Sequence, residues 1–154
     1  DCNAIIESFS NKLILGCMNT IIPDNVTTIG SKAFCSCRKL SSILLPNSIT
    51  TIEDSAFYEC IELDSITIPK NTTKIGQSAF SFCKSLQYIL WNARRCNDLL
   101  NQYYSPFVYD LFVEGNNHIK SFVFGDDGSV EGLIAVLFGH GDVILDATSH
   151  GSIE

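Results

Sequence analysis

Hydrophobic and polar positions follow one pattern that recurs three times along the chain at a spacing of 23 residues. Its best-kept part reads Ile-x-x-x-Ala-Phe-x-x-Cys and covers Ile29–Cys37, Ile52–Cys60 and Ile75–Cys83. Flanking apolar positions keep the same spacing, at Leu40, Leu63 and Leu86 and at Ile43, Ile66 and Ile89. A fixed period in the twenties is typical of a solenoid, in which each repeat buries its apolar ridge against the next copy.

Each repeat contains one segment with the composition of a β-strand. Leu40–Leu45 is the first, and Leu63–Ile68 and Leu86–Trp91 occupy the same place in the following repeats. Pro46 and Pro69 follow the first two segments and end them, because proline cannot donate to a strand ladder. We therefore expect a mainly β protein with one parallel strand per repeat and a short helical turn around each Ala-Phe pair.

The repeated apolar side chains predict the core. Phe34, Phe57 and Phe80 should stack into one aromatic column at the centre of the coils. Three of the seven cysteines also share a repeat position, and we expect them to form a ladder of buried free thiols, because parallel Cα–Cβ bonds give poor disulfide torsions. These are Cys37, Cys60 and Cys83. Of the others, Cys2 and Cys17 could pair, whereas Cys35 and Cys96 have no obvious partner.

The two ends depart from the repeat, although residues 1–154 are expected to form a single domain. Residues 1–18 predict a hairpin that caps the first coil, since an open end would expose core and strand edge, and residues 19–91 form the repeat body. Residues 92–118 break the spacing and are interpreted as an insertion. The remainder, 119–154, is expected to be irregular: 119–124 restores the strand pattern, and 133–138 and 143–145 suggest a further strand, turn and strand.

Composition excludes several classes of protein. A hydrophobic content of 45% with 18% charged residues is typical of a folded domain rather than a disordered one. The formal charge of −7 argues against a nucleic-acid partner, which needs a clustered basic surface. Apolar runs are too short for insertion into a membrane. The chain opens at Asp1 without a signal peptide, as a trimmed or mature protein would, and this leaves a secreted location open.

The repeat formula, followed by Leu-x-x-Ile-x-Ile-Pro, resembles the BspA-like, or Treponema-type, leucine-rich repeats. Two N-terminal phrases, Cys2–Glu7 and Lys12–Pro23, are similar to openings found in surface proteins of the Bacteroides group. The resemblance covers residues 2–91 well and 119–127 loosely. It implies a leucine-rich-repeat solenoid in a secreted or surface-attached protein that binds host proteins, matrix or other cells, and it does not imply catalysis.

Candidate catalytic and metal-binding residues gather near the C-terminus. His140 lies in a Gly-His-Gly turn and His150 follows closely, but a cysteine peptidase of the caspase-like type would need a cysteine on a later strand, and none follows Cys96. With His118 these histidines lack metal-ligand spacing, and 126–128 is too short an acidic stretch for calcium. We therefore expect no catalytic residue, no metal and no cofactor.

The exposed positions of the sheet remain as the candidate binding surface, because residues between buried ones point outward in a strand. Stacked strands would align them in two rows, here called lanes. The first lane is Ser42, Ser65, Tyr88 and Ser121, and the second is Leu44, Thr67, Leu90 and Val123. The leading hypothesis is a binding module for an extracellular protein or glycan. The alternatives are a spacer within a larger surface protein and, remotely, a hydrolase that uses the tail histidines. The sequence leaves the ligand and the oligomeric state open.

Overall fold

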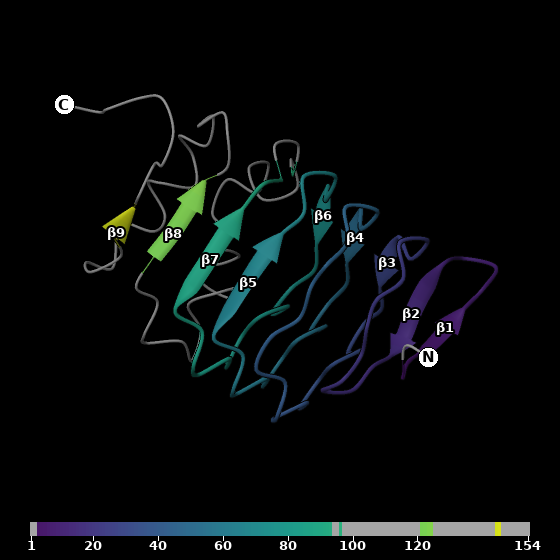
Figure 1. Cartoon of the computed structure of the whole chain (residues 1–154), viewed down its shortest axis with the longest axis horizontal. Coiled ribbons are helices and arrows are strands. Elements are labelled where there is room, and N and C mark those ends of the chain that lie inside the picture. Colours follow the sequence, from purple (N-terminus) through teal and green to yellow (C-terminus); the bar gives the residue numbers. More distant parts are fainter. Residues whose placement is uncertain (1–2, 94–95, 97–120, 125–143, 146–154) are drawn as a thin grey trace.

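The chain is described by a computed structural model for residues 3–93, 96, 121–124 and 144–145 (Figure 1). Nine strands lie in these residues: β1 (Ile5–Glu7), β2 (Lys12–Leu15), β3 (Thr28–Ile29), β4 (Thr51–Ile52), β5 (Ser65–Ile68), β6 (Lys74–Ile75), β7 (Tyr88–Trp91), β8 (Ser121–Phe124) and β9 (Ile144–Leu145). No helix lies in the described part of the chain. The molecule is therefore built from strands and turns.

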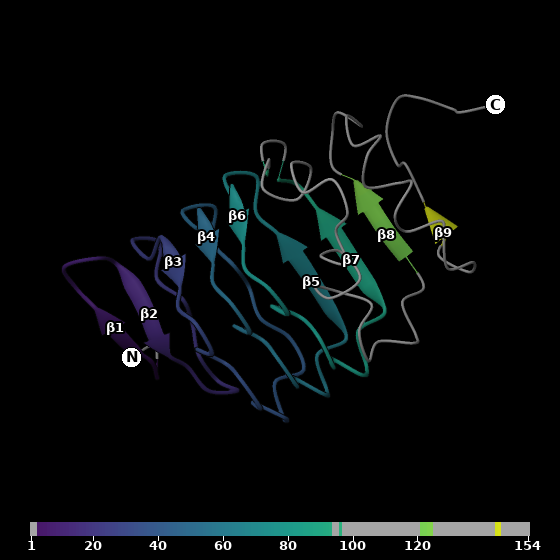
Figure 2. The ribbon, with the colours of Figure 1, turned by 180° about the vertical axis from the view of Figure 1, so that it is seen from behind.

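The strands form two sheets that run along the stack of coils (Figures 1 and 2). Sheet A has the order β1-β2-β3-β4-β6, and sheet B has the order β5-β7-β8-β9. Within sheet A, Thr28 pairs with Thr51 and Thr51 with Lys74, all in parallel. Each pair joins residues one repeat apart, so equivalent positions of successive coils lie side by side.

Sheet B continues beyond the three clear repeats. β8 pairs in parallel with β7, in the place predicted for residues 119–124, although the insertion separates the two strands in sequence. β9 then pairs in parallel with β8, and Ser121 faces Ile144. These two residues are again one repeat interval apart, so the tail adds a further parallel strand to the same sheet. The other segment expected to be a strand, 133–138, lies outside the described residues.

The predicted strand at Leu40–Leu45 is wrong, and its counterparts begin two residues later than predicted, at Ser65 and Tyr88. Leu40–Leu45 lies one repeat before β5, which is the first strand of sheet B. The backbone bond from Asp64 N–H to Ser41 O, at 3.2 Å, is made before the strand itself begins. Without a strand on its other side, the segment is not held in ladder geometry.

The predicted helical turn around each Ala-Phe pair is also wrong, because these residues form successive tight turns. Their N–H groups alternate between two acceptors: that of Ala33 donates to Gly30 O in the same coil (3.1 Å), and that of Phe34 donates to Ala56 O in the next coil (2.8 Å). Two residues of each turn have positive φ, as Lys32 does at 58°. A right-handed helix needs negative φ and N–H groups that bond within the segment, so both features exclude it.

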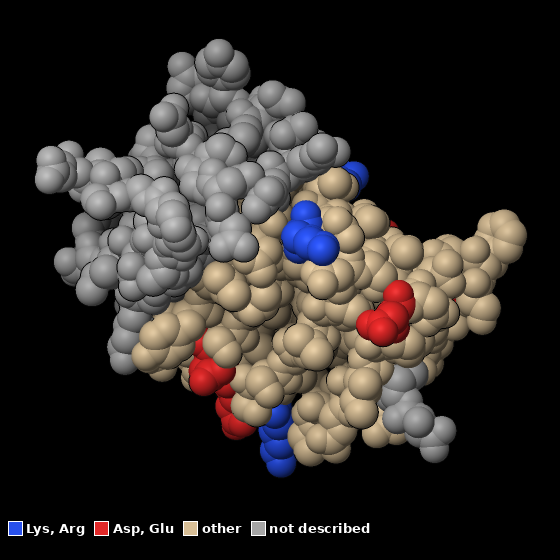
Figure 3. Space-filling model, turned by 45° about the horizontal axis from the view of Figure 1, so that its top comes forward, with Lys and Arg blue, Asp and Glu red and all other residues tan. Residues whose placement is uncertain are grey.

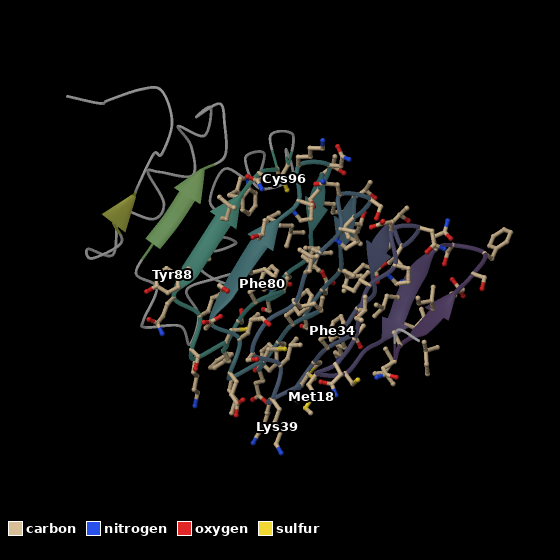
Figure 4. The ribbon with its side chains drawn as sticks, in the orientation of Figure 1. Met18, Phe34, Lys39, Phe80, Tyr88 and Cys96 are labelled. Atoms are coloured by element: carbon tan, nitrogen blue, oxygen red, sulfur yellow. The ribbon has the colours of Figure 1, made fainter. Side chains whose placement is uncertain are left out.

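The predicted aromatic column is confirmed. Phe34 and Phe57 stack with ring centroids 5.0 Å apart and planes 5° from parallel, and Phe57 and Phe80 stack at 5.2 Å and 4°. All three rings are buried, and Figure 4 shows Phe34 and Phe80 in the interior of the coils. The column therefore runs through the core of the repeat body, with buried Ala33, Ala56 and Ala79 beside it.

The N-terminal hairpin joins this stack through β2. β1 pairs antiparallel with β2, whereas β2 pairs in parallel with β3 and places Leu13 beside Ile29 in the core. Gly16 packs directly on the ring of Phe34, and any side chain there would collide with the ring. The backbone at Gly16, directly after the hairpin, therefore covers the ring of Phe34 at the N-terminal end of the aromatic column.

One ion pair ties the hairpin to the second repeat. Lys12 Nζ lies 2.7 Å from Glu53 Oε2, and the same carboxylate oxygen accepts the Ser31 backbone N–H at 2.8 Å. Desolvation raises the pKa of Glu53, but the hydrogen bonds from Lys12 and Ser31 and the nearby lysine charges outweigh it. The pKa of Glu53 therefore lies below its ordinary value of 4.5.

Free thiols at Cys60 and Cys83 are buried, as predicted, and each donates a hydrogen bond to a phenylalanine carbonyl at 3.1 Å. Hydrogen bonding with Cys83 and burial raise the pKa of Cys60. Cys37 is also a free thiol, but it is only half-buried, so its predicted inaccessibility is wrong. It sits in the first coil, where no complete coil precedes it to cover the sulfur. Desolvation still raises the pKa of Cys37, and Cys60 and Cys17 add to this effect.

The remaining cysteines are not alike. Cys17 and Cys35 are free and half-buried, and Cys96 is buried. The thiol of Cys17 is free and donates a hydrogen bond to the carbonyl oxygen of Asn3, with Sγ 3.6 Å from that oxygen. Cys2, the other half of the pair considered from the sequence, lies outside the described residues.

Phe57→Ala is expected to be the most damaging single substitution in the repeat body. Phe57 is fully buried and has a stacked ring on either side, so its removal opens a cavity that touches two neighbouring coils. The expected loss is roughly 3–5 kcal/mol of unfolding free energy, measured by chemical denaturation. Phe9→Ala is the control, because Phe9 is fully exposed and its removal should leave stability unchanged. An unchanged denaturation midpoint for Phe57→Ala would refute the packing role of the column.

Thiol labelling of the native protein should distinguish the cysteines. We expect Cys60 and Cys83 to react only in denaturant, because both side chains are buried away from the reagent. For Cys60 the raised pKa also keeps the reactive thiolate scarce. Cys37 should react slowly in the native state, because it is half-buried and its pKa is raised, and the fully denatured protein serves as the reference for complete labelling. Peptide mass mapping after timed labelling measures each site. Rapid native labelling of Cys60 would contradict the buried ladder.

Loss of the Lys12–Glu53 pair should produce a pH-dependent change in stability. Because the pKa of Glu53 is lowered in the folded protein, its contribution is complete above the ordinary value of 4.5 and is lost as the pH falls through the lowered pKa. Glu53→Gln should therefore cost up to about 1 kcal/mol at neutral pH and progressively less in acid, measured by denaturation at several pH values. Exposed Glu62→Gln is the control and should cost nothing at either pH. A constant deficit for Glu53→Gln would show that its charge is not involved.

Candidate functional site

The outer face of sheet B is built by the alternation of side chains along its strands. In β5 and β7, the buried positions are Ile66, Ile68, Ile89 and Trp91. The residues between them therefore point away from the core. At the C-terminal end of β7, the indole N–H of buried Trp91 donates a hydrogen bond to the carbonyl oxygen of Ala93 at 3.0 Å.

Register between the strands brings the predicted lanes together. Ser65 pairs with Tyr88 and Thr67 with Leu90. On the other side of β7, Tyr88 pairs with Ser121 and Leu90 with Val123. Tyr88 and Leu90 therefore stand in the middle of their lanes. For Ser121 and Val123 this placement rests on the backbone alone, because their side chains are not described.

The large apolar residues of the lanes are more exposed than the small hydroxyl residues beside them. Leu44 is 82% exposed, Tyr88 49% and Leu90 37%, whereas Ser65 and Thr67 are half-buried. Ser42 and Leu44 are exposed, but they lie in the segment that does not form a strand. Figure 4 shows Tyr88 directed away from the interior that holds Phe80. The face thus offers separate apolar side chains among small hydroxyl groups.

The lanes contain no Lys, Arg, Asp or Glu, and the nearest carboxylate is already engaged. Ser65 Oγ donates to Asp64 Oδ1 at 2.9 Å, within the same strand end. On the side of the molecule seen in Figure 3, Lys, Arg, Asp and Glu are few and cover less of the described surface than the other residues do. Such a surface suits contact through shape and apolar area rather than attraction of a charged polymer.

Chemistry other than binding finds few residues in the described part of the chain. No group of three His, Cys, Asp or Glu side chains there could hold a metal ion. His118, His140, His150 and the acidic turn at 126–128 all lie outside the described residues. The described residues contain no helix that is long and apolar enough to cross a membrane.

A second group of exposed apolar side chains was not foreseen from the sequence. It lies at the N-terminal end and includes Phe9, Met18 and Ile21. The sequence pattern suggested that the hairpin covers core, and it gave no sign that the hairpin itself presents apolar side chains to solvent. The neighbouring Leu13 and Ile22 are buried in the core, so only their exposure in the structure separates these two sets of apolar residues.

Comparison with known proteins agrees with the repeat architecture. A family model described as "BspA type Leucine rich repeat region (6 copies)" matches residues 6–103. No curated protein matches the chain.

Three solved structures are similar. A leucine-rich cell surface protein from Faecalibacterium prausnitzii is 38% identical over 47% of this chain and 19% of its own, with a TM-score of 0.46. A leucine-rich repeat protein from Bacteroides ovatus is 33% identical over 66% and 24%, with a TM-score of 0.46. One from Eubacterium ventriosum is 22% identical over 80% and 33%, with a TM-score of 0.56.

The chain spans between about a fifth and a third of the length of these three proteins, with values of 19%, 24% and 33%. The Eubacterium ventriosum structure shares the leucine-rich-repeat fold at low sequence identity. The family model itself matches more than half of the 154 residues. This chain therefore belongs to the BspA-type leucine-rich-repeat family.

Proposed function

We propose that this chain is a non-catalytic binding module of a secreted or cell-surface protein, and that it engages an extracellular protein or glycan through the outer face of sheet B. One observation carries the proposal: Tyr88 and Leu90 are exposed on the outer face of sheet B, and Leu44 is exposed one repeat before Thr67 of β5, although the repeat formula needs none of the three for packing. Large apolar side chains gathered on one face are typical of a contact surface.

The lanes also suit a contact in their geometry. Tyr88 has serine on both paired strands, so its ring has small neighbours and remains open to a ligand. Tyrosine is enriched among the residues that dominate binding energy, because it combines a large apolar ring with a hydroxyl group. The parallel ladder beneath it keeps the strands in fixed register, and a rigid surface loses little entropy on binding.

A spacer role is the second candidate, and the comparisons give a specific reason for it. The chain covers only 19% to 33% of the similar solved proteins, so a stack of this length would form part of a longer molecule in proteins of that size. In that role the exposed lanes would contact nothing, and their substitution would have no effect. The hydrolase alternative would instead depend on His140 and His150.

Tyr88→Ala combined with Leu90→Ser is expected to weaken ligand binding without loss of stability, since both side chains are exposed. The wild-type domain and this variant are each incubated with extracellular-matrix extract, and the components retained by the wild type alone are identified. Binding of each purified component is then measured. An aromatic anchor commonly contributes about 2 kcal/mol, so the dissociation constant should rise roughly thirtyfold.

The double variant His140→Ala and His150→Ala is the matched control and should bind as the wild type does. If the histidine variant loses binding while the lane variant keeps it, the site belongs to the C-terminal tail. If wild type and lane variant retain the same components, the binding proposal fails and the spacer role is favoured.

A further inference from the structure

Cys17 lies outside the repeated pattern of the sequence, yet the structure adds it to the ladder of repeat cysteines. The backbone N–H of Thr20 donates to the carbonyl oxygen of Cys17 at 3.1 Å, just as that of Leu40 donates to the carbonyl oxygen of Cys37 at 2.9 Å. The same bond follows each of the other two repeat cysteines. The turn that comes after a repeat cysteine is therefore also present after Cys17, in the segment that covers the first coil.

The backbone next to this cysteine is bound to the first coil. The N–H of Gly16 donates to the carbonyl oxygen of Ala33 at 2.9 Å, which joins the end of the hairpin to the turns that lead to Cys37. Met18, the following residue, lies close to Lys39 in Figure 4. The hydrogen bond and the figure agree in bringing the two cysteines together at the N-terminal end of the stack.

Cys17 also acts on Cys37 electrostatically. Burial is the largest cause that raises the pKa of Cys37, and the neighbouring thiols of Cys60 and Cys17 add to it. A nearby charge has this effect only over a short distance. Equivalent positions of adjacent coils lie about 4.8 Å apart, and a disulfide joins Cα atoms that are roughly 4.4–6.8 Å apart. The two thiols are thus within reach of a covalent bridge.

Two features favour Cys17 over Cys60 as the partner of Cys37. Cys37 and Cys60 are copies of one conformation, whose parallel Cα–Cβ bonds give poor disulfide torsions. Cys60 is also buried and donates to the carbonyl oxygen of Phe34 at 3.1 Å. The chain reaches Cys17 directly from the end of β2, whereas it reaches Cys37 through Ser36, which has a φ of 58°. Cys17 and Cys37 are therefore not bound to parallel geometry, and both are half-buried, so a small oxidant has access to them.

We propose that Cys17 and Cys37 form a disulfide when a low-molecular-weight disulfide such as oxidised glutathione is present, and that this bond locks the N-terminal hairpin onto the first coil. In the structure both thiols are free. Disulfides form and persist outside the cell, so the inference rests on the extracellular location proposed above, although not on the ligand of sheet B.

The bridge forms in two exchange steps. One of the two protein thiols loses its proton, and its sulfur attacks the small disulfide, which releases one small thiol and leaves a mixed disulfide on the protein. The second protein sulfur then attacks the first, the bond to the small molecule breaks, and a second small thiol leaves. Two electrons pass from the protein to the small disulfide, and the two protons end on the released thiols.

The consequence is a permanent cover for the aromatic column. Gly16, next to Cys17, packs on the ring of Phe34. Without the bridge, the hairpin is held to the coils by the two-residue pairing of β2 with β3 and by the Lys12–Glu53 ion pair. A covalent link beside Gly16 would keep the ring of Phe34 covered even when these contacts open.

Peptide mapping of the 154-residue chain tests the proposal. The reduced protein is incubated at rising ratios of oxidised to reduced glutathione, the remaining thiols are blocked, and non-reduced tryptic peptides are weighed. We expect the peptide 13–32, which contains Cys17, to be bridged to the peptide 33–38, which contains Cys35 and Cys37. The oxidised protein should melt roughly 5–10 °C above the reduced one, because the closed loop restricts the unfolded chain.

Cys35→Ser is the matched control, because Cys35 is a half-buried free thiol in the same peptide. This variant should keep the bridge and the shift in melting temperature, as should Cys2→Ser. Cys37→Ser should lose both, while in reducing buffer it should melt close to the wild type, since its side chain is only half-buried.

Three results would overturn the proposal: a protein that stays reduced at the highest ratio, a bridge from Cys17 to Cys2, or a bridge that survives in Cys37→Ser and is lost in Cys35→Ser. The Tyr88 variant keeps every cysteine, so failure of this proposal and failure of the binding proposal are distinguishable.

Discussion

Stacking of equivalent residues in successive coils is the constraint on which the rest of the structure depends. The phenylalanine rings repeat at 5.0 and 5.2 Å, close to the spacing of about 4.8 Å between strands in a sheet. One spacing therefore serves the aromatic column, the parallel strand pairs of both sheets and the turn ladder, in which Phe34 N–H donates to Ala56 O and Phe57 N–H to Ala79 O. Because all three have the same spacing, equivalent core residues such as Phe34, Phe57 and Phe80 meet the same neighbours in successive coils.

The sequence made the periodic parts of this arrangement predictable. The recurrence of Ala-Phe identified the aromatic column and its place in the core, and the alternation within Leu63–Ile68 identified which side chains of β5 point outward. These predictions succeed because burial repeats with the same period as the backbone. The turns were harder. Positive φ occurs at Lys32, Ser55 and Ser78, and none of these is glycine, the residue that usually signals such a conformation.

The ends could not be predicted in the same way, because a terminal coil lacks the neighbour that defines its copies. Leu40–Leu45 has the composition of its counterparts but not their strand, since sheet B begins beside it. Cys37 has the repeat position of Cys60 but not its burial, for the same reason. Of the candidate site, the alternation along β5 and β7 predicted that Ser65, Thr67, Tyr88 and Leu90 lie between buried residues, whereas the pattern of the N-terminal hairpin did not predict its exposed apolar side chains. Whether a segment forms a strand, and whether its side chains are buried, therefore depends on the neighbouring coils as well as on the composition of the segment.

Departures from the repeat formula show where the chain does something other than stack. Position 53 carries Glu where the other repeats carry Gly30 and Gly76. In the third repeat a Cβ in place of Gly76 would collide with the backbone of Glu53 and Asp54. In the second repeat Glu53 instead accepts the Ser31 N–H and pairs with Lys12 in the hairpin. Tyr88 departs similarly from the serines of its lane, and it does so on the outer face, where packing demands no large side chain. A departure from the repeat at a core position can be explained by packing. Tyr88 is not required for core packing, and its exposed ring is the feature of sheet B on which the proposed binding role depends.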